Sequence, residues 1–223
     1  MSPHWDEQLI HVIDFEGSAQ SGIVEFGVVS LRGMGIESVS TRLCRPTGVI
    51  PANEEETHGI TQAAAKGFAP FSDEWEHFAG LRESGPLGAH FASAENGMIK
   101  SVFPYARKSK DWIREGGVSA EWGPWIDTGA LFRDVVKTGD SLSLRVLIES
   151  EGLQEELDEL AEEYCPENRR SYHCALYDAL ASALLLILYC SDHYSGRATV
   201  QQLAILSKTG GKSRQSAEQS ELF

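Results

Sequence analysis

The chain is poor in cysteine and has no long hydrophobic run, and each absence excludes a class of protein. Its four cysteines form no CxxC pair and no repeated spacing, so the sequence predicts neither a zinc site nor a disulfide framework. The longest apolar run, residues 179–190, has about twelve residues, whereas a membrane-spanning helix needs roughly twenty. We therefore interpret it as a buried helix. Because Asp6 and Glu7 come early, we expect no signal peptide and a cytoplasmic protein without a membrane partner.

Basic residues are also scarce. Lys and Arg number 19 against 33 Asp and Glu, which gives a formal net charge of −14. Since affinity for phosphates comes mostly from Lys and Arg, this balance argues against a broad, non-specific nucleic-acid binder. It leaves open an enzyme that holds a few nucleotides through metal ions and local basic groups.

The charges are distributed unevenly along the chain. Residues 149–167 contain nine acidic residues and no basic one, which is typical of a solvated face turned away from a polyanion. The balance reverses in a basic segment whose members are Lys100, Arg107, Lys108, Lys110 and Arg114. This basic segment is either ordinary solvated surface or a phosphate-facing surface. Its position after one of the motifs below favours the second interpretation.

The hydrophobic fraction of 42% and the length of 223 residues fit a globular domain. Apolar runs bounded by turn residues predict strands over residues 9–14, 22–31, 36–43, 87–91 and 125–127. Periodicity and capping residues predict helices over residues 72–82, 95–103, 128–137, 142–164 and 175–190. Strands that come first and then alternate with helices imply an α/β fold, with a mixed central sheet flanked by helices.

Two segments fall outside this scheme. Residues 106–124 are the least assigned, and Trp112 and Trp122 within them cover the sheet edge, line a substrate groove or form a subunit contact; we favour a core or covering role. Residues 207–223 are polar and rich in Gly and Ser, which predicts a flexible tail after a single domain over residues 1–206.

The first chemical signal is the pair Asp14 and Glu16 at the end of the first predicted strand. Residues two apart on a strand project from the same face, so these carboxylates converge while Phe15 turns into the core. Two neighbouring carboxylates repel each other unless a cation lies between them, and oxygen-only ligands favour Mg²⁺ or Mn²⁺. Taken alone, a D-x-E pair at a strand end is more often ordinary surface.

A second signal is the pair His173 and Asp178 around the start of an apolar helix. On a regular helix, residues five apart lie on different faces. If His173 lies in the loop that enters the helix, both side chains reach one cleft. A buried carboxylate on an apolar helix needs a partner, which makes Asp178 harder to dismiss than a lone histidine.

Together these residues resemble the DEDD exonuclease superfamily, in its DnaQ-like histidine subclass (DEDDh). The resemblance covers roughly residues 9–189 and implies an RNase H-like fold. Its parts are Asp14-Phe15-Glu16, the loop Thr57-His58-Gly59-Ile60-Thr61 and the His173…Asp178 spacing.

One motif departs from the family pattern of histidine, asparagine, two variable residues, an aromatic and aspartate. The matching stretch here begins at His90, where Phe91 replaces the asparagine and Glu95 stands in the place of the aspartate. Glutamate keeps the charge but moves the carboxylate by about a bond length, which can alter rate or metal preference in a two-metal site. We expect a working but retuned site rather than an inactive relic.

The resemblance implies a 3′→5′ exonuclease acting on single-stranded nucleic-acid ends. It assigns two divalent ions, Mg²⁺ or Mn²⁺, to Asp14, Glu16, Glu95 and Asp178. His173 would be the general base, a role that suits a group titrating near neutrality. Substrate DNA in replication or repair is the leading hypothesis. The alternatives are an RNA substrate, or an inactive nuclease fold that serves as a binding module.

Substrate contacts are predicted around this centre. By the resemblance, Glu16 and the backbone of Gly17 lie near the terminal 3′-OH, and His58 and Ile60 pack on the last nucleotide. Phe15 is a further expected substrate contact. From position and charge alone, Arg169 and Arg170 either contact phosphates or are simple surface arginines.

The last five residues resemble the short peptide that bacterial replication proteins insert into the sliding clamp. The residues that carry this resemblance are Gln219, Leu222 and Phe223. An exposed Leu-Phe pair closing a polar tail is explained by a docking peptide, and a frayed terminus is the alternative.

Overall fold

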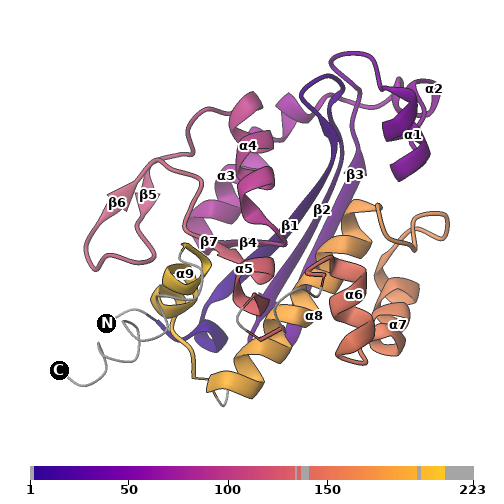
Figure 1. The fold of residues 1–223 in the computed structure, drawn as a ribbon. Coiled ribbons are helices and arrows are strands. Elements are labelled where there is room, and N and C mark those ends of the chain that lie inside the picture. Colours follow the sequence, from indigo (N-terminus) through magenta and orange to yellow (C-terminus); the bar gives the residue numbers. More distant parts are fainter. Residues whose placement is uncertain (1–2, 134, 137–140, 195–196, 209–223) are drawn as a thin grey trace.

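The computed structural model describes residues 3–133, 135–136, 141–194 and 197–208. The predicted clamp peptide and nearly all of the predicted tail lie outside the described residues. Within the described part, a five-stranded mixed sheet has helices on both faces (Figure 1), so the predicted fold class is confirmed.

The sheet has the strand order β3-β2-β1-β4-β7. Strands β1 (Leu9–Ser18), β2 (Gly22–Arg32) and β3 (Gly35–Leu43) form an antiparallel meander, as predicted. Strands β4 (Leu87–Ala89) and β7 (Trp125–Asp127) extend the sheet in parallel with β1. The carboxyl ends of β1, β4 and β7 therefore share one edge of the sheet.

Strand β1 runs four residues beyond its predicted end, and a bulge between Glu16 and Gly17 interrupts its pairing with β2. Strand β4 is shorter than predicted, because Phe91 adopts a left-handed conformation (φ 56°) that no strand contains. The N–H of Phe91 instead donates to the carboxylate of Asp127 at 3.0 Å.

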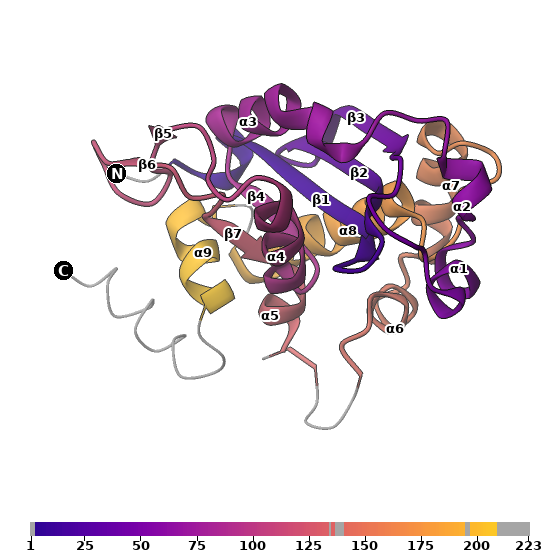
Figure 2. The same cartoon turned by 90° about the horizontal axis from the view of Figure 1, so that it is seen from above.

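The two faces of the sheet carry separate cores. Ile10 and Val12 of β1 lie in a cluster with helix α8 (Ala175–Tyr194). The alternate residues Ile13 and Phe15 lie in a second cluster, which is covered by α3 (Trp75–Ser84) and α4 (Ala92–Val102). Figures 1 and 2 show α8 on one face and α3 and α4 on the other. Because side chains alternate along β1, Asp14 and Glu16 belong to the α8 face.

Two predicted helices start elsewhere than expected. The helix predicted over residues 72–82 is preceded by a 3₁₀ turn, η2 (Phe71–Glu74), so Ser72 does not cap α3. The helix predicted from residue 95 begins at Ala92, because the carboxylate of Asp127 accepts the Ala92 N–H (3.0 Å) and stabilises the first turn of α4.

Two other helices are shorter than predicted. Helix α5 (Thr128–Phe132) is capped by Asp127, whose carboxylate accepts the Ala130 N–H, and it ends before the β-branched pair Val135 and Val136. The helix predicted over residues 142–164 is two helices, α6 (Leu144–Ser150) and α7 (Gln154–Tyr164), because Gly152 takes a left-handed conformation between them.

Helix α8 is longer than predicted and mostly buried, which confirms that the apolar run is a core helix. By length and composition it could cross a membrane, but 78% of its most apolar window is buried inside the protein. Helix α9 (Val200–Lys208) was not predicted. It packs beside β7 and α5, where the Ser207 hydroxyl accepts the Asp127 N–H at 2.8 Å.

The segment 106–124 forms the small hairpin of β5 (Ser109–Lys110) and β6 (Val118–Ser119). Both of its tryptophans are buried and donate to main-chain carbonyls, Trp112 to Arg82 and Trp122 to Phe103. The favoured core role of these two residues is confirmed. The remaining described elements are η1 (Trp5–Glu7), α1 (Ala52–His58) and α2 (Gln62–Ala65).

Candidate active site

The site begins at the carboxyl end of β1, where Asp14 and Glu16 project toward the first turns of α8. The bulge after Glu16 depends on Gly17, whose φ is 125°. A Cβ at this position would lie 2.1 Å from the carbonyl oxygen of Gly22, so glycine is required for the chain to turn here.

Helix α8 approaches β2 at another glycine, Gly27, which pairs with Asp14 across the sheet. A Cβ on Gly27 would lie 2.3 Å from the backbone of Ala175, the first residue of α8. The main chain of the helix therefore rests on the main chain of the strand. This contact brings the residues at the start of α8 close to the carboxylates of β1.

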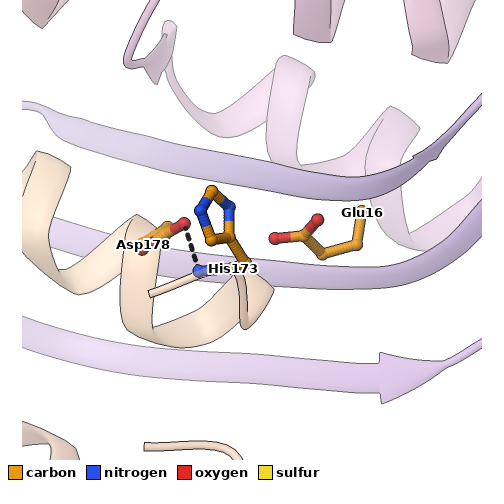
Figure 3. A group of neighbouring side chains, drawn as sticks. All are labelled: Glu16, His173 and Asp178. Atoms are coloured by element: carbon orange, nitrogen blue, oxygen red, sulfur yellow. Dashed lines mark hydrogen bonds between the residues drawn. The ribbon is translucent and has the colours of Figure 1, made fainter. Parts of the chain in front are cut away.

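His173 lies in the loop before α8 and Asp178 one turn inside the helix, as predicted. His173 has a left-handed conformation (φ 65°), and its N–H donates to the carboxylate of Asp178 at 3.0 Å. Ligand atoms of Glu16, His173 and Asp178 all lie within 4.8 Å of one another. Figure 3 shows the imidazole between the two carboxylates, so the expected convergence of these side chains is observed.

Glu95 joins the same group of acids from α4. It is buried, although it sits in the first turn of a surface helix. Its pKa is raised to about 8, first by burial and also by the charge of Asp178, while a hydrogen bond from the backbone of Phe15 lowers it in part. Glu95 therefore lies within the field of the acids that β1 and α8 supply.

All four acids have raised pKa values, and burial is the largest cause for each. The pKa of Asp14 lies well above its usual range, with further contributions from Glu95, Asp178 and Glu16. The pKa of Glu16 rises to about 8 and that of Asp178 to about 7. Grouped acids of this kind resist ionisation unless a cation joins them.

Two buried carboxylate oxygens have no hydrogen-bond partner among the described residues. They are Oε2 of Glu95 and Oδ1 of Asp178. A buried carboxylate oxygen without a donor is costly, and a divalent ion with oxygen ligands removes that cost. These carboxylate oxygens therefore fit a hard metal ion. His173 lies beside them, and its side chain is exposed.

His58 and Ile60 are both buried, so neither presents an open stacking face. Nδ1 of His58 accepts the Ile60 N–H at 3.0 Å, and its Nε2 is buried without a partner among the described residues. Both residues nevertheless line a cavity of about 340 Å³, which also includes Tyr172 and Cys174, the neighbours of His173. Phe15, expected near the substrate, has its side chain in the core below α3.

Arg169 and Arg170 are engaged with the protein itself, and the expectation that they also contact phosphates stays a prediction. Arg169 forms an ion pair with the buried carboxylate of Glu25. Arg170 donates to the carbonyl oxygens of Cys165 and Glu162 at the end of α7. These contacts support structural roles for both arginines.

Glu25 also belongs to the site, although no motif in the sequence marks it. It is one acid inside the otherwise apolar run of β2, and it stands directly opposite Glu16 on β1. Its charge raises the pKa values of Glu16 and Asp178.

The basic segment is also largely used within the protein. Arg107 pairs with Glu76 and Glu83, and Lys100 pairs with Glu121 at 2.6 Å. Lys110 lies over the ring of Trp112. Figures 1 and 2 show the β5–β6 hairpin at the opposite end of the protein from α1 and α2. The phosphate-facing role of the basic segment stays a prediction.

Comparison with known proteins identifies this arrangement. The sequence matches the exonuclease family over residues 12–186, which contain every acid of the site and His173. The chain belongs to the exonuclease family. No curated protein matches it in sequence.

Solved exonuclease structures share the fold. Exonuclease X in complex with 5′-overhanging duplex DNA has a TM-score of 0.65 at 23% identity, covering 89% of this chain and 99% of that one. The nuclease domain of 3′hExo, a DEDDh family member bound to rAMP, has a TM-score of 0.60 at 18% identity, with 84% and 94% covered. Escherichia coli exonuclease I in complex with a dT13 oligonucleotide has a TM-score of 0.59 at 14% identity. The match covers 84% of the chain described here and 42% of exonuclease I.

The predicted DEDDh resemblance is therefore confirmed at the level of family and fold. This exonuclease is a nuclease whose acidic site suits a divalent metal ion. The role of Glu95 in place of an aspartate stays a prediction.

Proposed function

We propose that this exonuclease hydrolyses phosphodiester bonds from the 3′ ends of single-stranded DNA in a metal-dependent reaction. The observation that carries the proposal is a buried group of acids with raised pKa values beside one exposed imidazole. Two of these acids keep a buried oxygen that has no hydrogen-bond partner in the part of the chain that the structure describes. Such a site is costly in the absence of cations and becomes favourable when they bind.

Two Mg²⁺ or Mn²⁺ ions are proposed as the cofactors, held by Asp14, Glu16, Glu95 and Asp178. When bound, such ions acidify a water molecule and stabilise the charge that develops on the phosphate. The protein's own contribution is to hold the four carboxylates converging, and bound cations would favour their ionised forms. The contact between Gly27 and Ala175 supports this, because it fixes α8 against the strands.

His173 is proposed as the general base. Its imidazole is exposed and lies between the carboxylates of Glu16 and Asp178 (Figure 3), so a ring nitrogen can take the proton of an attacking water. Asp178 has two tasks. One oxygen accepts the His173 N–H, and the other has no partner among the described residues, which leaves it available to a metal ion.

The cavity beside His173 is proposed to receive the terminal nucleotide. It is lined by His58, Gly59 and Ile60, the loop for which the family resemblance implies contact with the last nucleotide. Burial lowers the pKa of His58, which favours the neutral ring. Since Nδ1 of His58 accepts the Ile60 N–H, the proton of the neutral ring is on Nε2, which is buried beside the cavity.

DNA is favoured as the substrate, with RNA as the alternative. The similar structures include exonuclease X with duplex DNA and exonuclease I with dT13, but also 3′hExo bound to rAMP. The test uses single-stranded DNA and RNA of one sequence, labelled at the 5′ end, with Mg²⁺, Mn²⁺ or EDTA. A ladder that shortens from the 3′ end only with metal supports the proposal, and the preferred polymer decides the substrate.

Two variants sharpen this test. Asp14→Asn should abolish cleavage, whereas Asp73→Asn, which changes an exposed acid of η2, should leave it intact. If neither polymer is cut with either metal, the protein is a binding module with a nuclease fold.

The terminal peptide with Gln219, Leu222 and Phe223 is proposed to dock on a sliding clamp. It lies outside the described residues, and the resemblance of its sequence is what supports the proposal. The full chain and a variant lacking Leu222 and Phe223 are passed over an immobilised bacterial clamp. Equal retention of the two proteins would end the proposal.

A further inference from the structure

Glu25 is an acid for which the proposed mechanism has no task, although it stands beside the site. It is 3% exposed, lies on β2 and pairs directly with Glu16 on β1. Its Oε1 accepts Nε of Arg169 at 3.0 Å. Its Oε2 accepts a second N–H of Arg169 and also the backbone N–H of Ala175 at 2.9 Å. With three donors on its two oxygens, Glu25 is committed to protein contacts and is a poor candidate for a metal ligand.

Arg169 carries these contacts further. Its guanidinium donates to the carbonyl oxygens of two residues, His58 and His173, in addition to its bonds with Glu25. One side chain therefore connects β2, the loop at the cavity and the loop before α8. Five donors in a rigid plane suit arginine to this task, and lysine cannot reproduce it.

The loop that carries His173 is fixed on three sides. The N–H of His173 donates to Asp178, and the carbonyl oxygen of His173 accepts from Arg169. The N–H of Ala175, two residues later, donates to Glu25. His173 itself has a φ of 65°, which residues other than glycine rarely adopt. Such a conformation persists only when its surroundings determine it, and here three side chains do so.

We infer that Glu25 and Arg169 are a positioning pair, which holds the main chain of His173 in its left-handed conformation and so places the imidazole between Glu16 and Asp178. Glu25 is outside the lining of the cavity proposed for the terminal nucleotide, whereas Arg169 also lines that cavity. The inference rests on the proposed function of His173 as the base, and it adds how the protein holds that base in place.

The kinetic test uses Glu25→Gln, which keeps the size of the side chain and removes its charge. Displacing a reacting group by about 1 Å can cost about a hundredfold in rate, so we expect kcat to fall by about 10- to 100-fold. For Glu25→Gln, KM should change by less than about twofold, because Glu25 does not line the terminal-nucleotide cavity. Arg169→Lys is the second variant, and it keeps the positive charge beside Glu25 if Glu25→Gln fails to fold.

A double-mutant cycle with His173→Ala separates positioning from a general structural effect. If Glu25 acts through the imidazole, Glu25→Gln should cost less than about twofold in kcat once that imidazole is gone. If the same 10- to 100-fold loss appears in the His173→Ala background, Glu25 acts on another part of the site and the inference is overturned.

Hydrogen exchange of the protein gives a readout that needs neither metal nor substrate. Glu25→Gln and Arg169→Lys should raise the exchange rates of the His173 and Ala175 amides at least about tenfold while those of α3 stay unchanged. The matched control is Glu74→Gln. Glu74 pairs with Arg42 as Glu25 pairs with Arg169, and Arg42 likewise donates to a main-chain carbonyl oxygen, that of Ala69. That variant should alter neither these amides nor kcat.

The outcomes of the two proposals are distinguishable. If the wild-type protein cleaves no nucleic acid, the proposed function fails, and the exchange data alone show whether the pair holds the loop. If cleavage is present but both amides keep their protection in Glu25→Gln and Arg169→Lys, the positioning role is refuted.

Discussion

Replacing Asp178 with asparagine should remove activity and at the same time stabilise the metal-free protein. Asp178 is 8% exposed, and its pKa rises from 3.8 to about 7, with burial as the largest cause. At about 1.4 kcal/mol per pKa unit, the ionised form costs on the order of 4 kcal/mol of folding free energy. Asparagine keeps an oxygen that can accept the His173 N–H, so this stabilisation comes with little loss of hydrogen bonding.

The gain should depend on pH in a defined direction. A carboxyl group whose pKa is raised by folding destabilises the folded state only above its pKa in the unfolded chain. The advantage of Asp178→Asn should therefore be absent below about pH 4, grow as the pH rises toward 7, and remain constant above that value.

The assay is urea unfolding in EDTA at pH 4 and pH 8, with Asp73→Asn as the surface control. At pH 8 the free energy of unfolding of the variant should be higher than that of the wild type by up to about 4 kcal/mol. Saturating Mg²⁺ should stabilise the wild type by more than the variant, because the ion binds only the folded site. A variant no more stable than wild type at pH 8 in EDTA would refute the reasoning.

Three further predictions concern the same region. Gly27→Ala should destabilise the protein by about 1–3 kcal/mol or more and abolish cleavage, because the added Cβ would lie 2.3 Å from the Ala175 backbone. Urea unfolding measures the first effect and the oligonucleotide assay the second. Glu95→Asp should lower kcat by about tenfold, because the shorter side chain withdraws a buried carboxylate from the other acids; a variant as fast as wild type would show that the site accepts either length. The affinity for Mn²⁺, measured by calorimetry at pH 6, 7 and 8, should rise with pH, since protons compete for Glu16 and Glu95, whose pKa values are about 8; a constant affinity would contradict those values.

The parts of the fold that the sequence predicts are those governed by local pattern. Alternation along residues 9–43 predicts the meander, and the apolar run of α8 predicts a core helix. The predicted first and last residues of a helix are wrong where a tertiary contact determines them. Asp127 is a strand residue, yet its carboxylate caps both α4 and α5, and no local signal around Ala92 reveals that bond.

The site divides in the same way. Asp14 and Glu16 follow from strand periodicity, and His173 and Asp178 from their spacing around a helix start. The partner of Arg169 could not be predicted, because the ion pair joins residues 144 positions apart. Position and charge alone do not distinguish an arginine that binds phosphate from one that pairs with a buried acid of the protein. Glu25, that buried acid, differs in the sequence from the other residues of β2 only in its negative charge.

The bare contact between Gly27 and Ala175 has a consequence for how this enzyme can change. Where two secondary-structure elements contact each other through side chains, substitution by a slightly larger or smaller residue changes the distance between them in small steps. Here two peptide backbones touch, so no such intermediate exists. The length of the acids is not fixed by this contact, so a glutamate such as Glu95, one methylene longer than an aspartate, is the kind of change that the constraint leaves open.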